Sequence, residues 1–435
     1  MAKSLHLRRW TDRSVVAVAL IALASGFGQF GAVAALGDVS KDLGHMAAGG
    51  SIADKVGLSG TSLGIGLAII RLASIGSLPL VGIADRFGRR RVILSVTIAG
   101  LALTTAAAAS PGYWWFVVIF AFGRPLLSAT NALAEVMATE ETSARDRTAA
   151  VALVAAGYGV GAGISAIVHS LGSGVLGFRG IFALAVVPLM GVFALRGWVE
   201  EPSRFMVAEA GADHPTPVFG AVGPRYRKRV IVLCLIGVAI SIVTGPSTSF
   251  AFLFAQDVLH QAGWVTATMV VAAGAAGLCG LLGGRWLADH VGRRPAGTVA
   301  IVAIALTGTF AYTGSQPAFF FGYVLGTVSG SILAPAIGAL LTELFPTSVR
   351  ASVAGWWVTA GVLGAVGGLV VFGAVADVGN RFAAAAEVTF LPTIAAAGLF
   401  WFLPETKGRE PEALWPADDE EDNKEVKEDT KEVDV

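Results

Sequence analysis

Long apolar runs separated by short polar loops make up most of this chain. Each run holds about 17 to 25 residues, the length that a helix needs to cross the hydrocarbon core of a bilayer. Twelve such runs can be placed near residues 14–36, 58–80, 92–109, 113–137, 148–170, 180–198, 230–254, 264–287, 296–313, 318–341, 352–375 and 383–403. The pattern therefore predicts an all-α membrane protein with twelve transmembrane helices.

The composition agrees with this class. Apolar residues make up 54% of the 435 residues and charged residues only 14%, and the mean hydropathy is +0.70. A chain of this length cannot hide so much apolar surface inside one soluble core. Cys234 and Cys279 fall inside apolar runs, without the spacing of a metal site or a disulfide framework. We therefore expect no metal and no cofactor, and we expect both cysteines to be packing residues.

Basic residues and loop lengths indicate how the chain is arranged in the membrane. Lys and Arg gather at the N-terminus and after every second run, which by the positive-inside rule places both termini in the cytoplasm of a multi-pass cell-membrane protein. Residues 199–228 form the longest polar interruption in the middle of the chain. We expect an N-terminal six-helix bundle over 1–198, a cytoplasmic linker over 199–228, a C-terminal six-helix bundle over 229–409 and a disordered acidic tail over 410–435.

A sequence repeat supports two pseudo-symmetric bundles. The motif Asp-x-x-Gly-Arg-Arg begins at Asp85 and returns at Asp289, 204 positions later. Further charged residues are matched at the same offset to within one position: Glu140 with Glu343, Arg147 with Arg350, and Glu201 with Glu405. Matches that share one offset over half a chain indicate internal duplication.

These motifs resemble the loop signature of the major facilitator superfamily, which lies between the second and third helices and again between the eighth and ninth. Segments 201–205, 343–350 and 404–409 resemble three signatures of its sugar porters and of related porters for organic acids and other metabolites. The resemblance implies that loop acids and arginines pair across the cytoplasmic ends of the two bundles and latch an outward-open state. It assigns this role to Asp85, Arg86, Arg90, Glu140, Arg147, Glu201, Asp289, Arg293, Glu343, Arg350 and Glu405.

Two arginines lie inside apolar runs. Arg71 is mid-way along the second run and Arg124 mid-way along the fourth, where an unpaired charge costs at least about 2.5 to 3.5 kcal/mol. Arg124, Ser128, Asn131 and Glu135 recur at intervals of four, three and four, so they share one helical face. We expect this stripe to line a water-filled path, in which Arg71, Arg124, Ser128 and Asn131 contact the substrate.

The second half of the chain carries hydroxyl groups in place of these charges. Thr327 and Ser331 occupy the positions that correspond, at an offset of 203, to the start of the stripe. Thr244 and Thr248 lie in the seventh run beside Gly245–Pro246, a predicted helix break. Hydroxyl side chains in spans more often pack or bond to their own backbone, but their positions make these four candidates for substrate binding.

Proton coupling needs a group that titrates. In the proton-coupled sugar porters that the chain resembles, an arginine on span four pairs with an aspartate on span one, and Gln29 stands nearest to that place here. Either Glu135 carries the proton, with Arg124 responding to it, or Arg71 and Arg124 hold a substrate anion, because planar guanidinium groups suit carboxylates. A third reading is that Arg71 faces a structural carboxylate or snorkels to water. If the anion reading holds, Gln29 is a further substrate contact.

The sequence favours a secondary active transporter that moves a small polar organic solute, an organic anion such as a carboxylate, by alternating access and proton symport. The alternatives are proton-coupled sugar uptake, efflux of a drug or metabolite by proton antiport, and a non-transporting sensor on a transporter scaffold. No phosphate-binding loop and no nucleophile with its base is recognisable, so we expect neither an enzyme nor an ATP-driven pump, and no nucleic-acid partner. The expected partners are the solute, protons and the lipid bilayer, and the expected oligomeric state is a monomer.

Overall fold

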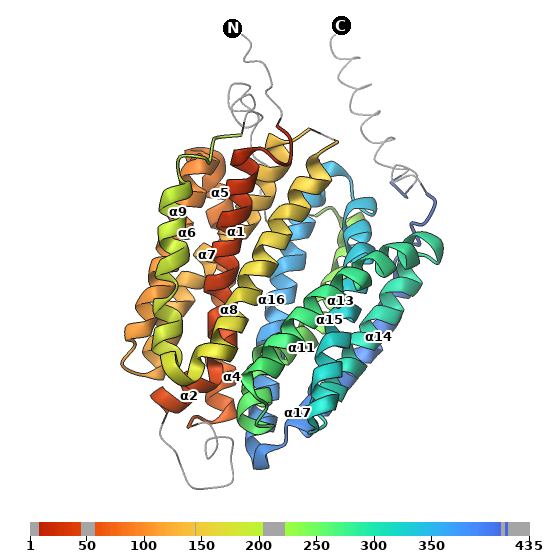
Figure 1. The fold of residues 1–435 in the computed structure, drawn as a ribbon. Helices are drawn as coiled ribbons and strands as arrows, with labels where there is room; N and C mark the ends of the chain where they lie inside the picture. The colour runs from red at the N-terminus through yellow and green to blue at the C-terminus, as the bar shows by residue number, and fades with distance from the viewer. Residues whose placement is uncertain (1–7, 45–56, 144, 203–221, 410–413, 416–435) are drawn as a thin grey trace, which may run out of the picture.

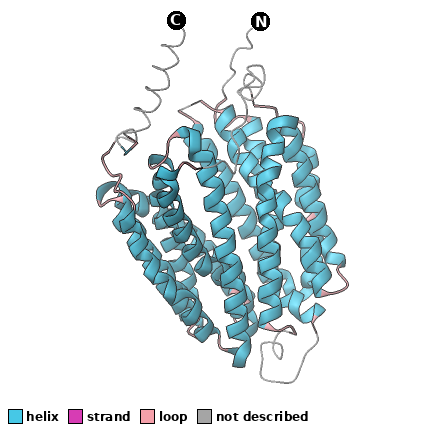
Figure 2. Cartoon of the chain, turned by 180° about the vertical axis from the view of Figure 1, so that it is seen from behind, coloured by secondary structure: helices cyan, strands magenta, loops and turns pink. Residues whose placement is uncertain are grey.

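The computed structural model describes residues 8–44, 57–143, 145–202, 222–409 and 414–415. These residues form helices and connecting turns, with no strand among them (Figures 1 and 2). Within them, twelve helical segments are long and apolar enough to cross a membrane, which confirms the number predicted from the apolar runs. Most of the predicted linker over 199–228 and of the predicted tail over 410–435 lies outside the described residues.

The first half of the chain, up to residue 202, supplies six of these spans. Its first span is α1 (Arg13–Ala34), which is followed by the short helix α2 (Leu36–Leu43). Its third span is α6 (Arg89–Ala106) with the 3-10 turn η2 (Ala107–Ala109), and its fourth is α7 (Tyr113–Glu141). The second span is irregular, because the 3-10 turn η1 (Ser74–Gly76) joins α4 (Gly60–Ala73) to α5 (Ser77–Phe87). The fifth span is most of α8 (Arg147–Ala183), and the sixth combines the end of α8 with α9 (Val186–Leu195).

The second half, from residue 222, supplies the other six. Its long helices are α11 (Pro224–Ser249), α13 (Gly263–His290), α14 (Arg293–Ala311), α15 (Gln316–Glu343) and α16 (Thr347–Asp377). One helical turn, α12 (Ala251–Leu253), and a π-helix, η3 (Phe254–Val258), follow α11. The twelfth span consists of α17 (Phe382–Phe390) and the 3-10 segment η5 (Leu391–Phe402). Several helices extend past the predicted runs into charged residues, because hydropathy marks only the apolar part of a helix.

Packing contacts divide the helices into two sets that follow chain order. In the first half, α1 packs on α7 and α8, and α6 packs on α7; in the second, α13 and α14 pack on α15, and α11 packs on α16. Between the sets, α4 packs on α16 and α8 packs on α13. Figure 1 shows the sets side by side, the first in red to yellow and the second in green to blue. This arrangement confirms the predicted fold of two six-helix bundles.

The two ends of the molecule differ in how the bundles meet. We call the end that contains the turns at Gly88 and Gly292 the Gly88 end, and the opposite end, which contains Lys41, the Lys41 end. The described chain begins and ends at the Gly88 end, at the top of Figure 1, where the helices of the two halves diverge. α4 packs along α16 nearer the Lys41 end, whereas its continuation α5 packs on α6 and α7 of its own half. The halves therefore contact each other mainly toward the Lys41 end.

Glycines allow the close contact between α4 and α16. A Cβ atom at Gly64 would collide with the backbone of Leu369 and come within 3.3 Å of the Cα atom of Gly373. A Cβ atom at Gly373 would likewise come within 3.1 Å of the Cα atom of Gly64. Small residues at such crossings let two helix backbones approach closely in a membrane. The two halves are therefore in close backbone contact where these glycines meet.

Candidate functional site

A cavity of about 240 Å³ lies between the two halves. The first half lines it with Arg71 of α4, Arg124 of α7 and Tyr158 of α8. The other lining residues are Gln29, Phe30 and Val33 of α1, Thr244, Gly245, Thr248 and Ser249 of α11, and Leu369 of α16. Both arginines of the apolar runs therefore face the seam between the halves.

Neither arginine has a carboxylate partner in the described part of the chain. No ion pair between described residues involves Arg71 or Arg124. The Nε atom of each guanidinium group is buried and has no hydrogen-bond partner there. Two cationic groups that line one cavity in a low-dielectric surrounding attract a mobile anion.

Local irregularities in α4 and α7 place the two arginines. Arg71 lies in the last turn of α4, where its carbonyl oxygen accepts a hydrogen bond of 2.5 Å from Ser74 Oγ as the chain tightens into η1. Arg124 precedes Pro125, which lies inside α7. A Cβ atom at Gly76 would lie 3.3 Å from the ring of Pro125. A glycine in the 3-10 turn therefore lets the second span approach α7 where both arginines project.

Gln29 lines the cavity from α1 and is held by a short chain of hydrogen bonds. Its Nε2 atom donates to Ser25 Oγ at 2.9 Å, and Ser25 Oγ donates to the carbonyl oxygen of Leu127 at 2.9 Å. The side chain of Gln29 is buried. The amide therefore has a fixed place beside the two arginines, although it cannot supply the negative charge that an aspartate would.

The rest of the predicted stripe on α7 does not line this cavity. Ser128 and Asn131 lie one and two turns beyond Arg124 on α7, and neither is among the lining residues. The Oδ1 atom of Asn131 is buried without a hydrogen-bond partner among the described residues. Glu135 is exposed and lies nearer the Gly88 end. Of the four stripe residues, only Arg124 lines the cavity, and the predicted substrate contacts of Ser128 and Asn131 stay predictions.

Two of the predicted hydroxyl residues lie elsewhere. Thr327 lines a separate pocket within the second half. Ser331 packs against α13, where its Oγ atom would lie 3.2 Å from a Cβ atom at Gly277. Ser331 therefore makes a helix contact in this structure, and its proposed contact with substrate stays a prediction.

The charged residues of the first repeat motif are paired within their own half. Arg89 lies 2.6 Å from Glu140 Oε1 and 3.1 Å from Asp85 Oδ1. The carboxylate of Glu201 accepts hydrogen bonds from the backbone N–H groups of Arg89 at 2.6 Å and Arg90 at 3.1 Å. The Glu201 carboxylate therefore caps the N-terminus of α6, where the free backbone N–H groups favour an anion.

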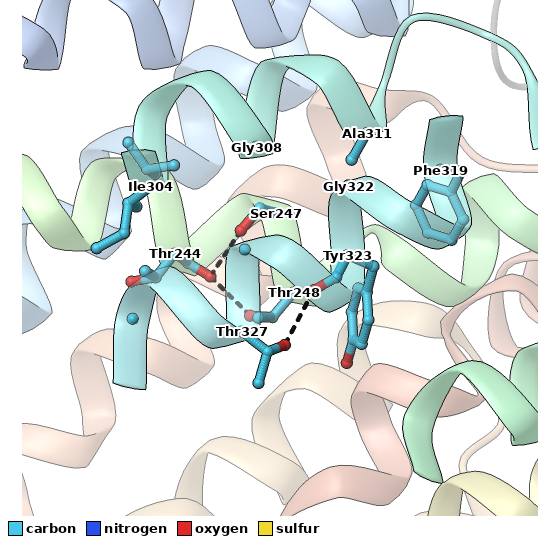
Figure 3. A pocket seen from close by; sticks show the side chains of 13 residues that line it. Thr244, Ser247, Thr248, Ile304, Gly308, Ala311, Phe319, Gly322, Tyr323 and Thr327 are labelled. Carbon is cyan, nitrogen blue, oxygen red and sulfur yellow. Dashed lines mark hydrogen bonds between the residues drawn. The ribbon is translucent and has the colours of Figure 1, made fainter. Parts of the chain in front are cut away.

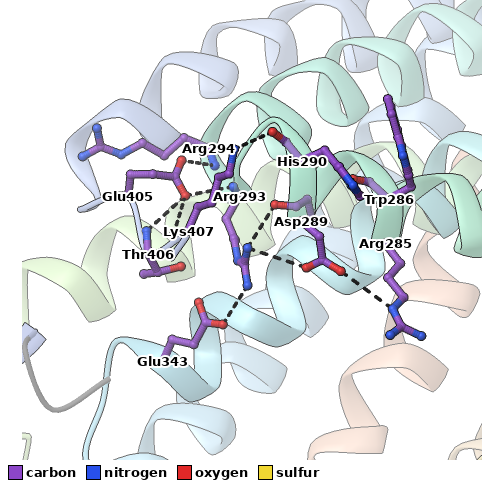
Figure 4. A network of polar contacts seen from close by, with 11 residues as sticks. Arg285, Trp286, Asp289, His290, Arg293, Arg294, Glu343, Glu405, Thr406 and Lys407 are labelled. Atoms are coloured by element: carbon purple, nitrogen blue, oxygen red, sulfur yellow. Dashed lines mark hydrogen bonds and ion pairs between the residues drawn. The ribbon is translucent and has the colours of Figure 1, made fainter. Parts of the chain in front are cut away.

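The second motif repeats this geometry (Figure 4). Arg293 lies 3.1 Å from Glu343 Oε1 and 3.7 Å from Asp289 Oδ1. Glu405 accepts hydrogen bonds from the backbone N–H groups of Arg293 at 2.9 Å and Arg294 at 3.0 Å. The two networks match each other as the sequence repeat predicts. Each network joins residues of its own half only.

The remaining residues of the predicted latch also contact their own half or solvent. Arg90 donates from its side chain to the carbonyl oxygens of Val199 and Arg196, and Arg350 donates to those of Thr342 and Phe345. Arg86 is exposed, and the Nε atom of Arg147 is buried without a partner among the described residues. Pairing across the two halves would require a conformation other than this one, so that part of the latch stays a prediction.

Polar contacts join the halves at the Lys41 end. Lys41 Nζ lies 2.5 Å from Asp257 Oδ1. The carboxylate of Asp377 in α16 accepts hydrogen bonds from the backbone N–H of Gly60 at 3.0 Å and from Thr61 Oγ1 at 3.1 Å, at the N-terminus of α4. Sequence reasoning missed these contacts because each one joins segments that are far apart in the chain.

Comparison with known proteins gives the family. The sequence matches the model of the Major Facilitator Superfamily over residues 18–308 and 257–430. The chain belongs to the Major Facilitator Superfamily. It is 24% identical over 364 residues to a putative metabolite transport protein of Haemophilus influenzae, with 78% of this chain and 85% of that protein covered. It is 24% identical over 367 residues to a gallate transporter of Pseudomonas putida, with 74% and 79% covered.

The fold of this superfamily member is also similar to solved structures. The xylose transporter from E. coli in its inward open conformation aligns with a TM-score of 0.69 at 17% identity, over 92% of this chain and 98% of that one. Family and fold together show a multi-pass membrane transporter for small organic solutes, not an enzyme. Sequence reasoning did not predict that Tyr158 lines the cavity. The only sequence feature that marks this residue is its place between two glycines, Gly157 and Gly159, inside a span.

Proposed function

We propose that this transporter moves small organic anions, above all carboxylates, by alternating access. The observation that carries the proposal is the pair of arginines, Arg71 and Arg124, which line one cavity without an acidic partner among the described residues. A carboxylate in the cavity would supply the missing negative charge and accept parallel hydrogen bonds from a guanidinium group. Hydrogen bonds to charged groups contribute about 1.5 to 3 kcal/mol each.

The chemistry of the cavity favours an anion over a neutral sugar. A neutral solute would leave two guanidinium groups beside the cavity uncompensated, and buried charges without a partner are costly. Similarity to a protein named as a gallate transporter supports the same solute class, because gallate is a carboxylate.

We further propose that the Gly88 end faces the cytoplasm and that the protein lies in the cell membrane with both termini inside. Arginines are concentrated at the Gly88 end, which is the distribution that the positive-inside rule requires. With this orientation, the contacts at the Lys41 end make the structure an inward-facing state. Rocking of the bundles would bring the Gly88 ends together, where acids and arginines of the two halves would exchange partners and latch the outward-open state.

Proton symport completes the proposal, with the protein acting as a monomer. Glu135 is the proposed proton carrier, because its spacing along α7 puts it on the helical face of Arg124, about 16 Å away, and its side chain is not buried against other helices. A proton on Glu135 would change the field that Arg124 experiences and so couple the two ligands.

Uptake into proteoliposomes tests the anion site. Wild-type protein should accumulate labelled benzoate under an inward-directed proton gradient. Arg71→Gln and Arg124→Gln should each lose binding and uptake, with unfolding temperatures within a few degrees of the wild type. Arg227→Gln is the matched control, because Arg227 is exposed on α11 and does not line the cavity. Normal uptake by both cavity variants would overturn the proposal.

A second comparison tests the coupling. Glu135→Gln should retain counterflow exchange and lose uphill accumulation, because exchange needs no net proton movement. Uphill accumulation at the wild-type rate would show that Glu135 is not the proton carrier.

A further inference from the structure

A second pocket adjoins the central cavity. It has a volume of about 220 Å³ and is enclosed by α11, α14 and α15 of the second half (Figure 3). Thr244 and Thr248 of α11 line both this pocket and the central cavity. The two cavities therefore adjoin at these two threonines, and a solute in the central cavity would lie next to the second pocket.

Several glycines line this pocket, and one of them borders open space. Gly308 on α14 and Gly326 and Gly330 on α15 are among its lining residues. A Cβ atom at Gly330 would meet no atom within 4 Å, so helix packing does not require a glycine there. Glycine inside a helix is less favourable than alanine, and the open space at Gly330 is consistent with a requirement for room in the pocket.

The polar atoms of the pocket are mostly hydrogen-bond acceptors. Ser247 and Thr248 donate their hydroxyl protons to the carbonyl oxygen of Thr244, at 3.4 and 2.7 Å. Thr327 donates to the carbonyl oxygen of Tyr323 at 3.0 Å. A hydroxyl oxygen that donates to its own helix keeps lone pairs with which to accept. The pocket therefore suits a ligand group that brings its own O–H or N–H donors.

Tyr323 adds a phenol group to the same pocket. Figure 3 shows its hydroxyl at the same end of the pocket as the side chain of Thr327. Among the described residues that line the pocket there is no Asp, Glu, Lys or Arg. The pocket is therefore suited to a neutral polar group, whereas the central cavity carries the positive charge.

We propose that this pocket binds the hydroxyl-bearing end of a substrate whose carboxylate is held by Arg71 and Arg124. The inference rests on the proposed function and narrows its substrate class to carboxylates that carry a hydroxyl group remote from the carboxylate. It makes Tyr323 and Thr327 specificity-determining residues, because their oxygens meet the hydroxyl group. It assigns Gly330 the role of leaving space for that end of the solute.

Binding of matched acids to the full-length protein tests this inference. The probes are benzoate against 4-hydroxybenzoate and hexanoate against 6-hydroxyhexanoate, with dissociation constants measured by calorimetry. The wild type should bind the hydroxylated member of at least one pair about 2- to 10-fold more tightly, the range expected for one neutral hydrogen bond. Thr327→Val and Tyr323→Phe should bring this ratio of dissociation constants close to one by weakening the binding of the hydroxylated acid.

A pocket-filling variant and a control complete the design. Gly330→Leu should lose the preference for the hydroxylated acid by excluding its distal end. Thr342→Val is the matched control, because Thr342 lies on the same helix, is exposed, and donates to the carbonyl oxygen of Gly338 at 3.0 Å outside the pocket. Its ratio should stay at the wild-type value.

The possible outcomes separate this inference from the proposed function. If the wild type binds none of the four acids, both are overturned. If it binds them through Arg71 but Thr327→Val, Tyr323→Phe and Gly330→Leu all keep the wild-type ratio, only the role of the second pocket is overturned. If the variants bind the plain and hydroxylated acids with equal affinity, the role of the second pocket is supported.

Discussion

Lys41 and Asp257 join the two halves of the protein through an ion pair in which Nζ and Oδ1 are 2.5 Å apart. Lys41 lies on α2 and Asp257 in η3, so the pair crosses the seam. The Lys41 side chain is 44% exposed and that of Asp257 only 9%. Loss of the lysine would therefore leave a nearly buried carboxylate without its partner, which costs more than the loss of a surface ion pair.

We expect Lys41→Gln to shift the protein toward a conformation in which the Lys41 end opens. The shift should be about 1 kcal/mol or more, because one charge-assisted contact across the seam is lost. Spin labels attached at Asp42→Cys and Val378→Cys, with the two native cysteines replaced by serine, would report longer distances between α2 and the end of α16. Lys228→Gln, at the opposite end, is the control and should leave the distances unchanged. An identical distance distribution in Lys41→Gln would contradict this prediction.

The same contact should respond to pH. Burial raises the pKa of Asp257, although the hydrogen bond from Lys41 opposes this, and the nearby titratable groups are Asp38 and His169, which lie 2.9 Å apart. A carboxyl with a raised pKa binds its proton more tightly in this conformation than when it is exposed to water. The conformation is therefore stabilised by acid and weakened as pH rises from the ordinary value of about 4 to the raised value.

Label distances recorded across this pH range test the expectation. They should lengthen as pH rises in the wild type, and Asp257→Asn should remove that dependence because no proton can leave an amide. A pH response that persists unchanged in Asp257→Asn would assign it to another group.

The glycine contact between α4 and α16 should control the same equilibrium by steric means. Gly64→Leu places a side chain against the backbone of Leu369, so we expect the halves to separate at the Lys41 end and uptake to fall by at least about tenfold, equivalent to about 1.4 kcal/mol. Gly191→Leu on α9 is the control, since a Cβ atom there meets nothing within 4 Å. Uptake assays in proteoliposomes compare the two, and equal rates would show that the crossing tolerates a side chain.

Glu405 should contribute to the stability of the second half. Burial raises its pKa, but backbone hydrogen bonds more than offset this effect, so the net pKa of Glu405 is lowered. The stabilisation is present above the ordinary glutamate value of about 4.3 and is lost as pH falls through the lowered value. Glu405→Gln should destabilise the protein by about 1 kcal/mol at pH 7, a value discounted because the side chain is partly exposed.

Thermal unfolding in detergent measures this effect. The difference between wild type and Glu405→Gln should shrink below about pH 4. Glu387→Gln, an exposed carboxyl group on α17, is the control, and an equal loss of stability in both variants would show that the backbone contacts of Glu405 are not the cause.

Several features could be predicted from the sequence because they follow from rules that act locally. Bilayer thickness sets the length of apolar runs, so the twelve spans were predictable, and Arg71 and Arg124 stand out because charge inside such a run is costly. Tyr158 and Ser249 could not be singled out, since tyrosine and serine pack inside spans without penalty. Their place in the cavity depends on how α8 and α11 are rotated against their neighbours.

The loop arginines show a second kind of limit. Arg89, Arg90 and Arg91 follow one another, and sequence reasoning selected Arg90, whereas in this structure it is Arg89 that pairs with Glu140 and Asp85. Gly88 has a φ of 91°, and the direction in which the chain leaves this turn decides which guanidinium group meets Glu140. The offset of 204 would have identified Arg89 as the counterpart of Arg293, but only if applied to single residues of the motif.

The uneven placement of charge between the halves has a consequence for unloading. Both guanidinium groups belong to the first half, while α11 contributes only hydroxyl and backbone groups to the cavity. A captured anion would therefore stay tethered to one bundle while the other swings away, and the swing itself would break only neutral contacts. Departure of the anion then becomes a separate event, whose rate depends on water and salt reaching the two arginines rather than on the swing.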